Sequence, residues 1–188
     1  MDLSKTAYVI LGMLRLGKRT GYEIKSTMDR STRFFWVASY GQIYPELKLL
    51  EDLGLVEGES APNGGRQRRA YVLTPAGESE LRSWIASGRP LHFELRHEGV
   101  LRLFFADAAT ADEQVDLLRT IRGEHQRVRD ELAAIEPGAE AARDESGDRF
   151  PLLTLEFGIA YADFITGWCE QMEHRLAAET AETADPRS

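Results

Sequence analysis

Apolar residues recur at three- and four-residue steps along the first part of the chain, which is the spacing of an amphipathic helix. A first helix is predicted over 3–15, with an apolar stripe formed by Leu3, Ala7, Ile10, Leu11 and Leu14. A second helix is predicted over 20–30, because Thr20 and Glu23 have the spacing of a capping box. The apolar segment 34–37 is too short for a core helix, and we expect it to pack as a connector under the third helix.

The third predicted helix, 39–53, has two faces of different character. Its apolar face carries Ile43, Leu47, Leu50 and Leu53, and we expect this face to point into the core. Another face carries Tyr40, Tyr44 and Lys48, with Gln42 near the N-terminal end. Gly54 follows directly, where a left-handed helix cap is needed.

Two short strands, 55–59 and 69–73, follow this helix. The residues between them are rich in Gly, Pro and Asn and carry Arg66 and Arg68, so they are predicted to form a basic hairpin tip with Arg69 beside it. Thr74 and Pro75 are typical of a helix start. This fourth helix is predicted to end near residue 87 and to bury Leu81, Trp84 and Ile85.

Three helices, a two-stranded basic wing and a further helix occur in the order of a winged helix-turn-helix. In that motif the second helix of the pair enters the major groove of DNA, and the wing contacts phosphates or the minor groove. Each feature alone has a simpler explanation, since tyrosines can be packing residues and basic hairpin tips are usually solvated turns. The candidate DNA-binding residues are Tyr40, Gly41, Gln42, Tyr44, Lys48, Lys18, Arg19, Tyr22, Arg66, Arg68 and Arg69.

The second half of the chain is predicted to be helical. A helix is expected within 93–105, and Thr110 with Glu113 forms another capping box that opens a helix reaching about residue 135. The polar segment 136–149 is predicted to be a flexible loop, with a short helix within it as the alternative. A last helix is expected over 150–178, and residues 179–188 are expected to be disordered. The fold class is therefore mainly α with a small β wing, and the predicted domains are 1–88 and 89–178.

The last predicted helix carries two adjacent apolar stripes, more than packing on one neighbour requires. One stripe runs through Phe150 and Trp168, and the other runs through Leu155 and Cys169. We expect one stripe to pack within the subunit and the other to form a two-fold homodimer, although burial of the whole helix in a monomeric core is the alternative. The candidate dimerisation residues are Phe150, Leu153, Phe157, Tyr161, Phe164, Trp168, Met172 and Leu176.

The net charge of −8 argues at first against a nucleic-acid partner, but it is unevenly distributed. Residues 1–88 contain 12 Lys and Arg against 10 Asp and Glu, whereas residues 89–188 contain 11 against 21. The predicted DNA-binding half is therefore mildly basic, and the acidic charge lies in the half that is not expected to contact DNA.

Features of an enzyme or metalloprotein are missing from the sequence. The four histidines have no metal-ligand spacing, no phosphate-binding glycine loop is present, and Cys169 is expected to be a small core residue. We expect no metal, no cofactor and no catalysis. No apolar run could span a membrane and no signal peptide is recognisable, so a cytoplasmic location is expected. Tyr161 and Trp168 near the expected dimer seam form a candidate pocket for a small aromatic effector, although a core role is the alternative.

Several segments together resemble PadR-family regulators. They are SYGQIYPEL at 39–47, LEDLGLV at 50–56, RRAYVLTPAG at 68–77, TGYEI at 20–24 and the last helix with Tyr161 and Trp168. The resemblance extends to about residue 177, and the combination is more specific than any single piece. Ala70 departs from the pattern, because an aromatic residue is common there.

The resemblance implies a dimeric transcription regulator, often a repressor of detoxification or efflux genes, that in some members responds to small aromatic or drug-like compounds. It places Tyr40, Gly41, Gln42 and Tyr44 in the recognition helix, with Arg66 and Arg68 in the wing. We therefore expect a homodimer that binds double-stranded DNA at an inverted repeat. The alternative is a small-molecule-binding or scaffold dimer that keeps the winged helix as a protein-interaction module.

Overall fold

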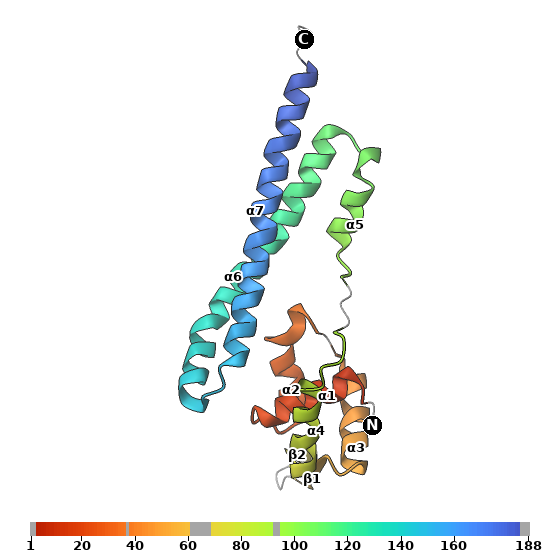
Figure 1. The fold of residues 1–188 in the computed structure, drawn as a ribbon, viewed down its shortest axis with the longest axis vertical. Coiled ribbons are helices and arrows are strands. Elements are labelled where there is room, and N and C mark those ends of the chain that lie inside the picture. The colour runs from red at the N-terminus through yellow and green to blue at the C-terminus, as the bar shows by residue number, and fades with distance from the viewer. Residues whose placement is uncertain (1–2, 37, 61–68, 92–94, 185–188) are drawn as a thin grey trace. The chain divides into compact units, whose positions relative to one another are not determined.

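A computed structural model describes residues 3–36, 38–60, 69–91 and 95–184. The chain divides into two compact units, Met1–His92 and Phe93–Ser188. The first unit contains α1 (Lys5–Arg15), α2 (Gly21–Met28), a 3₁₀ turn (Thr32–Phe34), α3 (Tyr40–Asp52), β1 (Val56–Ser60), β2 (Arg69–Leu73) and α4 (Pro75–Ile85) (Figure 1). The second contains α5 (Glu98–Phe104), a 3₁₀ turn (Ala106–Ala108), α6 (Ala111–Ser146) and α7 (Phe150–Ala184).

The helices of the first unit begin and end at the residues that carry capping signals. Glu23 N–H donates to Thr20 Oγ1 at 3.1 Å and Thr20 N–H donates to Glu23 Oε2 at 3.0 Å, so the predicted capping box opens α2. Thr74 Oγ1 caps α4 in the same way by accepting the N–H of Gly77. Gly54 adopts φ +68° directly after α3, which is the left-handed conformation that glycine allows at low cost.

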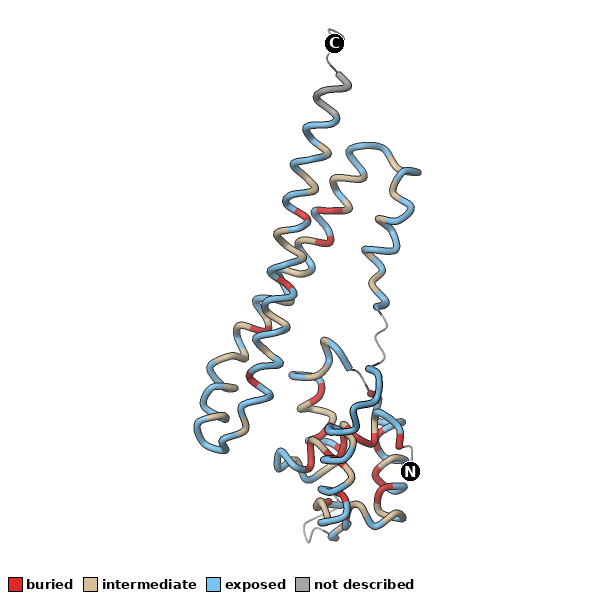
Figure 2. Tube along the Cα trace, in the orientation of Figure 1, coloured by how far each residue is buried: buried red, intermediate tan, exposed pale blue. Residues whose placement is uncertain are grey.

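The core of the first unit is formed by the apolar faces of α1, α2 and α3 (Figure 2). Ile10, Ile24, Ile43 and Leu47 are completely buried there, and burying each such side chain stabilises the fold by about 1.5–3 kcal/mol. Two expectations for this unit are wrong. Ile85 is 71% exposed because α4 ends there, and the connector residues Phe35 and Trp36 are exposed rather than packed under α3.

The wing is an antiparallel pair in which Val56 lies opposite Leu73 and Gly58 lies opposite Tyr71. Tyr71 and Val56 are buried against the helices, which fixes the register of the pair. The structure confirms the expected fold class of helices with a two-stranded sheet. The predicted hairpin tip, with Arg66 and Arg68, lies outside the described residues.

The second unit is dominated by α6 and α7, which run side by side in opposite directions (Figure 1). Their shared core contains Leu118, Ile121 and Cys169, and Leu103 of α5 packs against it. The helix α6 opens at the predicted capping box, where the N–H of Thr110 donates to Glu113 Oε2 at 2.8 Å. None of the described helices is long and apolar enough to cross a membrane.

Two predicted boundaries in this unit are wrong. The expected loop 136–149 is mostly helical, because α6 continues through Pro137 to Ser146 and ends at Gly147 with φ +76°. Partly buried positions at Ile135, Ala139 and Arg143 continue one face of the helix past Pro137, so packing outweighs the cost of about 3 kcal/mol for an interior proline. The tail predicted to be disordered from 179 is helical as far as Ala184.

Candidate nucleic-acid interface

The exposed face of α3 begins with two stacked tyrosines. The rings of Tyr40 and Tyr44 lie 6.3 Å apart between centroids, with 18° between their planes. Their side chains are 43% and 52% exposed, although the opposite face of α3 is completely buried at Ile43. The Nζ atom of Lys25 in α2 lies 5.7 Å from the centroid of the Tyr40 ring. Lys25 also pairs with Asp29 one turn further along α2. The aromatic rings therefore form a surface that a rigid core supports from behind.

Gln42 has a structural role that the sequence pattern did not indicate. The backbone N–H of Ser39 donates to Gln42 Oε1 at 2.9 Å, and Ser39 Oγ lies 3.3 Å from the same oxygen. This arrangement satisfies a backbone donor at the start of α3. Because the carboxamide oxygen of Gln42 accepts the capping bond from Ser39, the NH₂ group of Gln42 is the part of the side chain that can bind another partner. Gly41 and Lys48 are exposed on the same helix.

The start of α2 lies directly against the exposed face of α3. Gly21 is buried, and a Cβ atom built on it would lie 2.8 Å from Cε1 of Tyr44, closer than real Cβ contacts. Tyr22, the next residue, is 58% exposed. The predicted residues of α2 and α3 are thus brought together on one side of the first unit.

Two of the predicted DNA-binding arginines are paired with carboxylates of the same unit. Arg19, in the turn between α1 and α2, places an Nη atom 2.8 Å from Oε2 of Glu59 in β1. Arg69 in β2 pairs with Glu51 near the end of α3. The positive charge of both guanidinium groups is therefore partly neutralised within the unit, which the basic composition of the wing did not suggest.

A third carboxylate, Glu23, lies at the start of α2 beside Lys18. The backbone N–H of Arg19 donates to Glu23 Oε2 at 2.9 Å and lowers the pKa of Glu23 below its ordinary value. Bonds from Thr20 and the charge of Lys18 act in the same direction, whereas desolvation opposes them. Glu23 therefore stays charged at neutral pH and holds the turn that carries Lys18 and Arg19.

The residues that sequence reasoning missed are Lys25, Glu51 and Glu59. Lys25 follows Tyr22 by three residues, so helical spacing alone places the two on one side of α2. Glu51 and Glu59 had no comparable signal, because their partners Arg69 and Arg19 are 18 and 40 residues away in the chain.

The second unit exposes a row of large apolar side chains along α7. The row contains six of the eight predicted dimerisation residues, and its members are Phe150, Leu153, Phe157, Tyr161, Phe164 and Trp168. The other two, Met172 and Leu176, pack against the core formed with α6. The adjacent stripe, which includes Cys169, also packs on α6, and burial raises the pKa of the Cys169 thiol. We call the six exposed residues the α7 row.

The predicted effector residues Tyr161 and Trp168 are both members of the α7 row and are 37% exposed. The ring of Tyr161 lies 6.2 Å from that of His125 in α6. Two hollows in this unit lie along α5 and have Leu101 in common, and neither is lined by Tyr161 or Trp168. Within the described residues, no group of three His, Cys, Asp or Glu could hold a metal ion.

Two protein-family models match the chain. The transcriptional regulator PadR-like family matches residues 10–83, and the model described as virulence activator alpha C-term matches residues 95–177. The negative transcriptional regulator PadR of Bacillus subtilis is 34% identical over 113 residues, which are 60% of this chain and 62% of that protein. This match therefore spans less than two thirds of that relative. The probable transcriptional regulator Rv1176c of Mycobacterium tuberculosis is 29% identical over 178 residues, covering 84% of this chain and 89% of that protein.

Solved structures of the Bacillus subtilis protein resemble the chain over nearly its whole length. PadR in complex with operator DNA has a TM-score of 0.82 and 27% identity, and the match covers 93% of this chain and 99% of that chain. PadR in complex with p-coumaric acid has a TM-score of 0.77 and 25% identity, with 94% and 99% covered. The chain therefore carries a PadR-like domain over residues 10–83 and is similar to a PadR transcriptional regulator over nearly its whole length. The resemblance noted in the sequence is confirmed, as is the expectation that the protein is not an enzyme, because these relatives are regulators.

Proposed function

We propose that this protein is a sequence-specific DNA-binding transcription regulator that represses its target genes as a homodimer on an inverted-repeat operator. The observation that carries the proposal is the exposed face of α3. Tyr40, Gln42 and Tyr44 stand out from a helix whose other face is buried at Ile43, Leu47 and Leu50. A rigid helix with exposed polar and aromatic groups near its N-terminal end is suited to the major groove.

The chemistry of these residues fits two kinds of DNA contact. The amide of Gln42 can bond to base edges, and the rings of Tyr40 and Tyr44 can pack against thymine methyl groups. Lys18 and Lys48 would contact phosphates, which orient the protein without reading sequence. The wing-tip residues Arg66 and Arg68, which lie outside the described residues, would extend these phosphate contacts or enter the minor groove.

The second unit would supply the dimer. The α7 row exposes Phe157 at 67% and Phe164 at 65%, and a contiguous apolar surface of this kind marks an interaction site. An isologous interface around a two-fold axis would cover the row on both subunits at once. Two recognition helices would then reach successive major grooves about 34–36 Å apart. The proposed division is a DNA-binding domain over 1–88 and a dimerisation domain over 89–178.

The sign of regulation and the effector are proposed from the relatives. The Bacillus subtilis relative is named a negative regulator, and it has been crystallised with p-coumaric acid. A small aromatic compound is therefore the effector class that we propose, with Tyr161 and Trp168 as its candidate contacts. An effector that binds the DNA-free form more tightly would release the operator by mass action.

Selection of duplexes from a random pool by the full-length protein tests the proposal. We expect an inverted repeat to be enriched, and the selected duplex to bind at least about 1000-fold more tightly than random duplex at physiological salt. The logarithm of the affinity should fall steeply and linearly with that of the salt concentration, because phosphate contacts release counterions. Enrichment of no sequence, together with salt-insensitive behaviour on heparin, would contradict the proposal and favour a scaffold dimer.

A further inference from the structure

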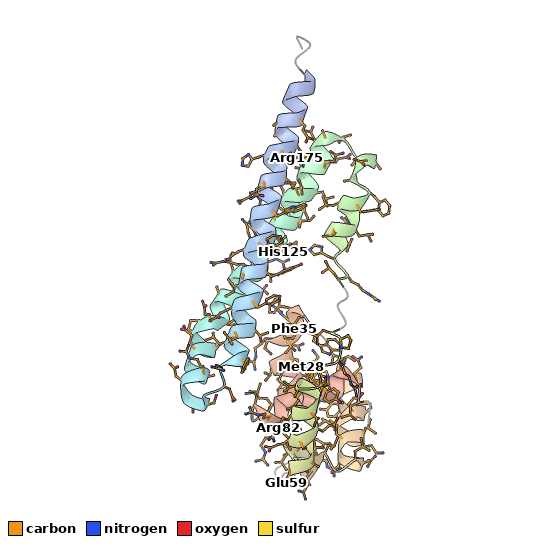
Figure 3. All side chains as sticks on the ribbon, in the orientation of Figure 1. Met28, Phe35, Glu59, Arg82, His125 and Arg175 are labelled. Atoms are coloured by element: carbon orange, nitrogen blue, oxygen red, sulfur yellow. The ribbon has the colours of Figure 1, made fainter. Side chains whose placement is uncertain are left out.

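Two arginine–carboxylate pairs join the wing strands, near their ends next to residues 61–68, to α3 and to the turn before α2. One pair links Arg19, in the turn before α2, to Glu59 in β1. Figure 3 labels Glu59 on the first unit. The other links Arg69 in β2 to Glu51 in α3. Both arginines belong to the residues that the sequence predicts to contact DNA. The structure places each beside an internal carboxylate, so both guanidinium groups already have an anionic partner in the free protein.

The two pairs differ in how firmly the surrounding structure holds them. Arg19 and Glu59 are 52% and 59% exposed, and such surface pairs add little stability. Glu51 is only 24% exposed and also accepts the backbone N–H of Gly58 at 3.2 Å. The guanidinium carbon of Arg69 lies 5.8 Å from the centroid of the Tyr71 ring. Separating Arg69 from Glu51 would therefore leave a half-buried carboxylate without its cation, whereas separating Arg19 from Glu59 exposes nothing new.

The backbone around Arg19 is fixed independently of Glu59. Its carbonyl accepts the N–H of Tyr71 at 2.7 Å, and its own N–H donates to Glu23 at 2.9 Å. A change of partner at the guanidinium group therefore needs only side-chain rotation. A DNA phosphate offers the same paired oxygens as a carboxylate, so it can take the place of Glu59 directly.

We propose that Glu59 acts as a gate on Arg19: a DNA phosphate displaces Glu59 from Arg19 on binding, whereas Arg69 stays with Glu51 and serves only to hold the wing. This inference rests on the proposed function and assigns different roles to two arginines of the same surface. Because a phosphate must first displace Glu59, this carboxylate weakens the sequence-independent part of binding. It thereby limits how tightly phosphate contacts alone can hold the protein on arbitrary DNA.

The test measures binding of the full-length chain to a labelled random-sequence duplex over a range of salt concentrations. Arg19→Gln should lower the salt slope by about 0.9, the contribution of one phosphate contact, and Arg69→Gln should leave the slope unchanged. Glu59→Gln should bind this duplex up to about five-fold more tightly at low salt, because the carboxylate that competes with phosphate for Arg19 has been removed. Glu51→Gln is the matched control, which makes the same chemical change on the fixed pair.

Circular dichroism and thermal melting show whether each variant is folded, and we expect Arg69→Gln and Glu51→Gln to melt earlier than Glu59→Gln. Equal slopes for the two arginine variants would overturn the division of roles. Unchanged affinity of Glu59→Gln would show that Glu59 does not compete with phosphate for Arg19, even if the wild type selects an operator as proposed. A wild-type chain that binds no duplex at any salt would contradict the proposed function and this inference together.

Discussion

The ring of Tyr44 in α3 lies directly over Gly21, the first residue of α2. A Cβ atom on residue 21 would lie 2.8 Å from Cε1 and 3.0 Å from Cζ of that ring. Any side chain larger than hydrogen must therefore push the ring aside. Because the Tyr44 side chain is 52% exposed, the ring can move without disturbing the core. The absence of a side chain at Gly21 thus determines where an exposed aromatic group of α3 lies.

Gly21→Ala should weaken operator binding much more than it weakens folding. We expect a free energy of unfolding within about 1 kcal/mol of the wild type, since alanine favours the helix and the displaced ring is exposed. Operator affinity should fall by about 5- to 150-fold if the Tyr44 contact is worth about 1–3 kcal/mol. Anisotropy titrations and chemical denaturation measure the two quantities.

The control for Gly21→Ala is the same substitution in a Tyr44→Ala background, where it should have no further effect on binding. Gly12→Ala provides a second control, because a Cβ there meets no atom within 4 Å and should only raise helix stability. Equal losses of binding from Gly21→Ala with and without Tyr44 would show that the ring is not the cause.

Gln42 should have separable structural and recognition roles. Gln42→Glu keeps an oxygen that can accept the N–H of Ser39, so α3 should remain capped, while the NH₂ donor is lost. Gln42→Ala loses both, and we expect it to cost about 1 kcal/mol of stability. Both variants should relax sequence choice at one operator position, which selection from a random pool would measure. Loss of affinity that is uniform across all sequences would contradict a base-reading role.

The α7 row should hold the dimer together. Phe157→Asp removes a side chain that is 67% exposed in the single chain. Because both subunits of a two-fold dimer carry the substitution, the interface loses two aromatic side chains. At about 1.5 kcal/mol or more per buried aromatic, the dimer dissociation constant should rise by at least about 100-fold. Sedimentation equilibrium measures this constant. Glu156→Lys, on the same helix but outside the row, should leave the protein dimeric, and a monomeric wild type would refute the assignment.

The stability of the second unit should decrease in mild acid because of His97. Val100 N–H donates to His97 Nδ1 at 3.2 Å, so the His97 proton is assigned to Nε2, which lies 3.4 Å from His125 Nε2. His125 Nδ1 lies 2.9 Å from the carbonyl of Ile121, so it is assigned as the donor. The bond from Val100 requires an unprotonated Nδ1 and therefore a neutral His97 ring. Burial lowers the pKa of His97 below its ordinary value of 6.5, and the electrostatic effect of the nearby His125 lowers it further.

Because the unfolded chain binds this proton more readily, the stabilising contribution is complete above pH 6.5 and is lost as the pH falls from 6.5 through the lower pKa of folded His97. Urea denaturation at several pH values measures the effect. His97→Asn keeps a side chain that can cap α5 but cannot titrate, so its stability should vary less over this interval. A slope equal to that of the wild type would exclude His97 as the source.

Local sequence signals predicted the parts of this fold that depend on neighbouring residues. The capping boxes at Thr20 and Thr110, the cap at Thr74 and the strand over 69–73 all occur where their side chains indicated. The buried stripe of α3 was equally predictable, because helical periodicity alone assigns Ile43, Leu47 and Leu50 to one face. The family resemblance rests on the same stretches of sequence.

Contacts between distant segments decided what the sequence left open. Periodicity showed two apolar stripes on α7, but only the packing of α6 against one of them leaves the α7 row exposed. The same packing keeps α6 helical through Pro137, where local signals predicted a loop. The partners of Arg19 and Arg69 and the position of Tyr44 over Gly21 likewise became visible only in the folded chain. Helix caps and stripes arise within a few residues, whereas charge pairing, close approach and the choice of buried face depend on segments that only folding brings together.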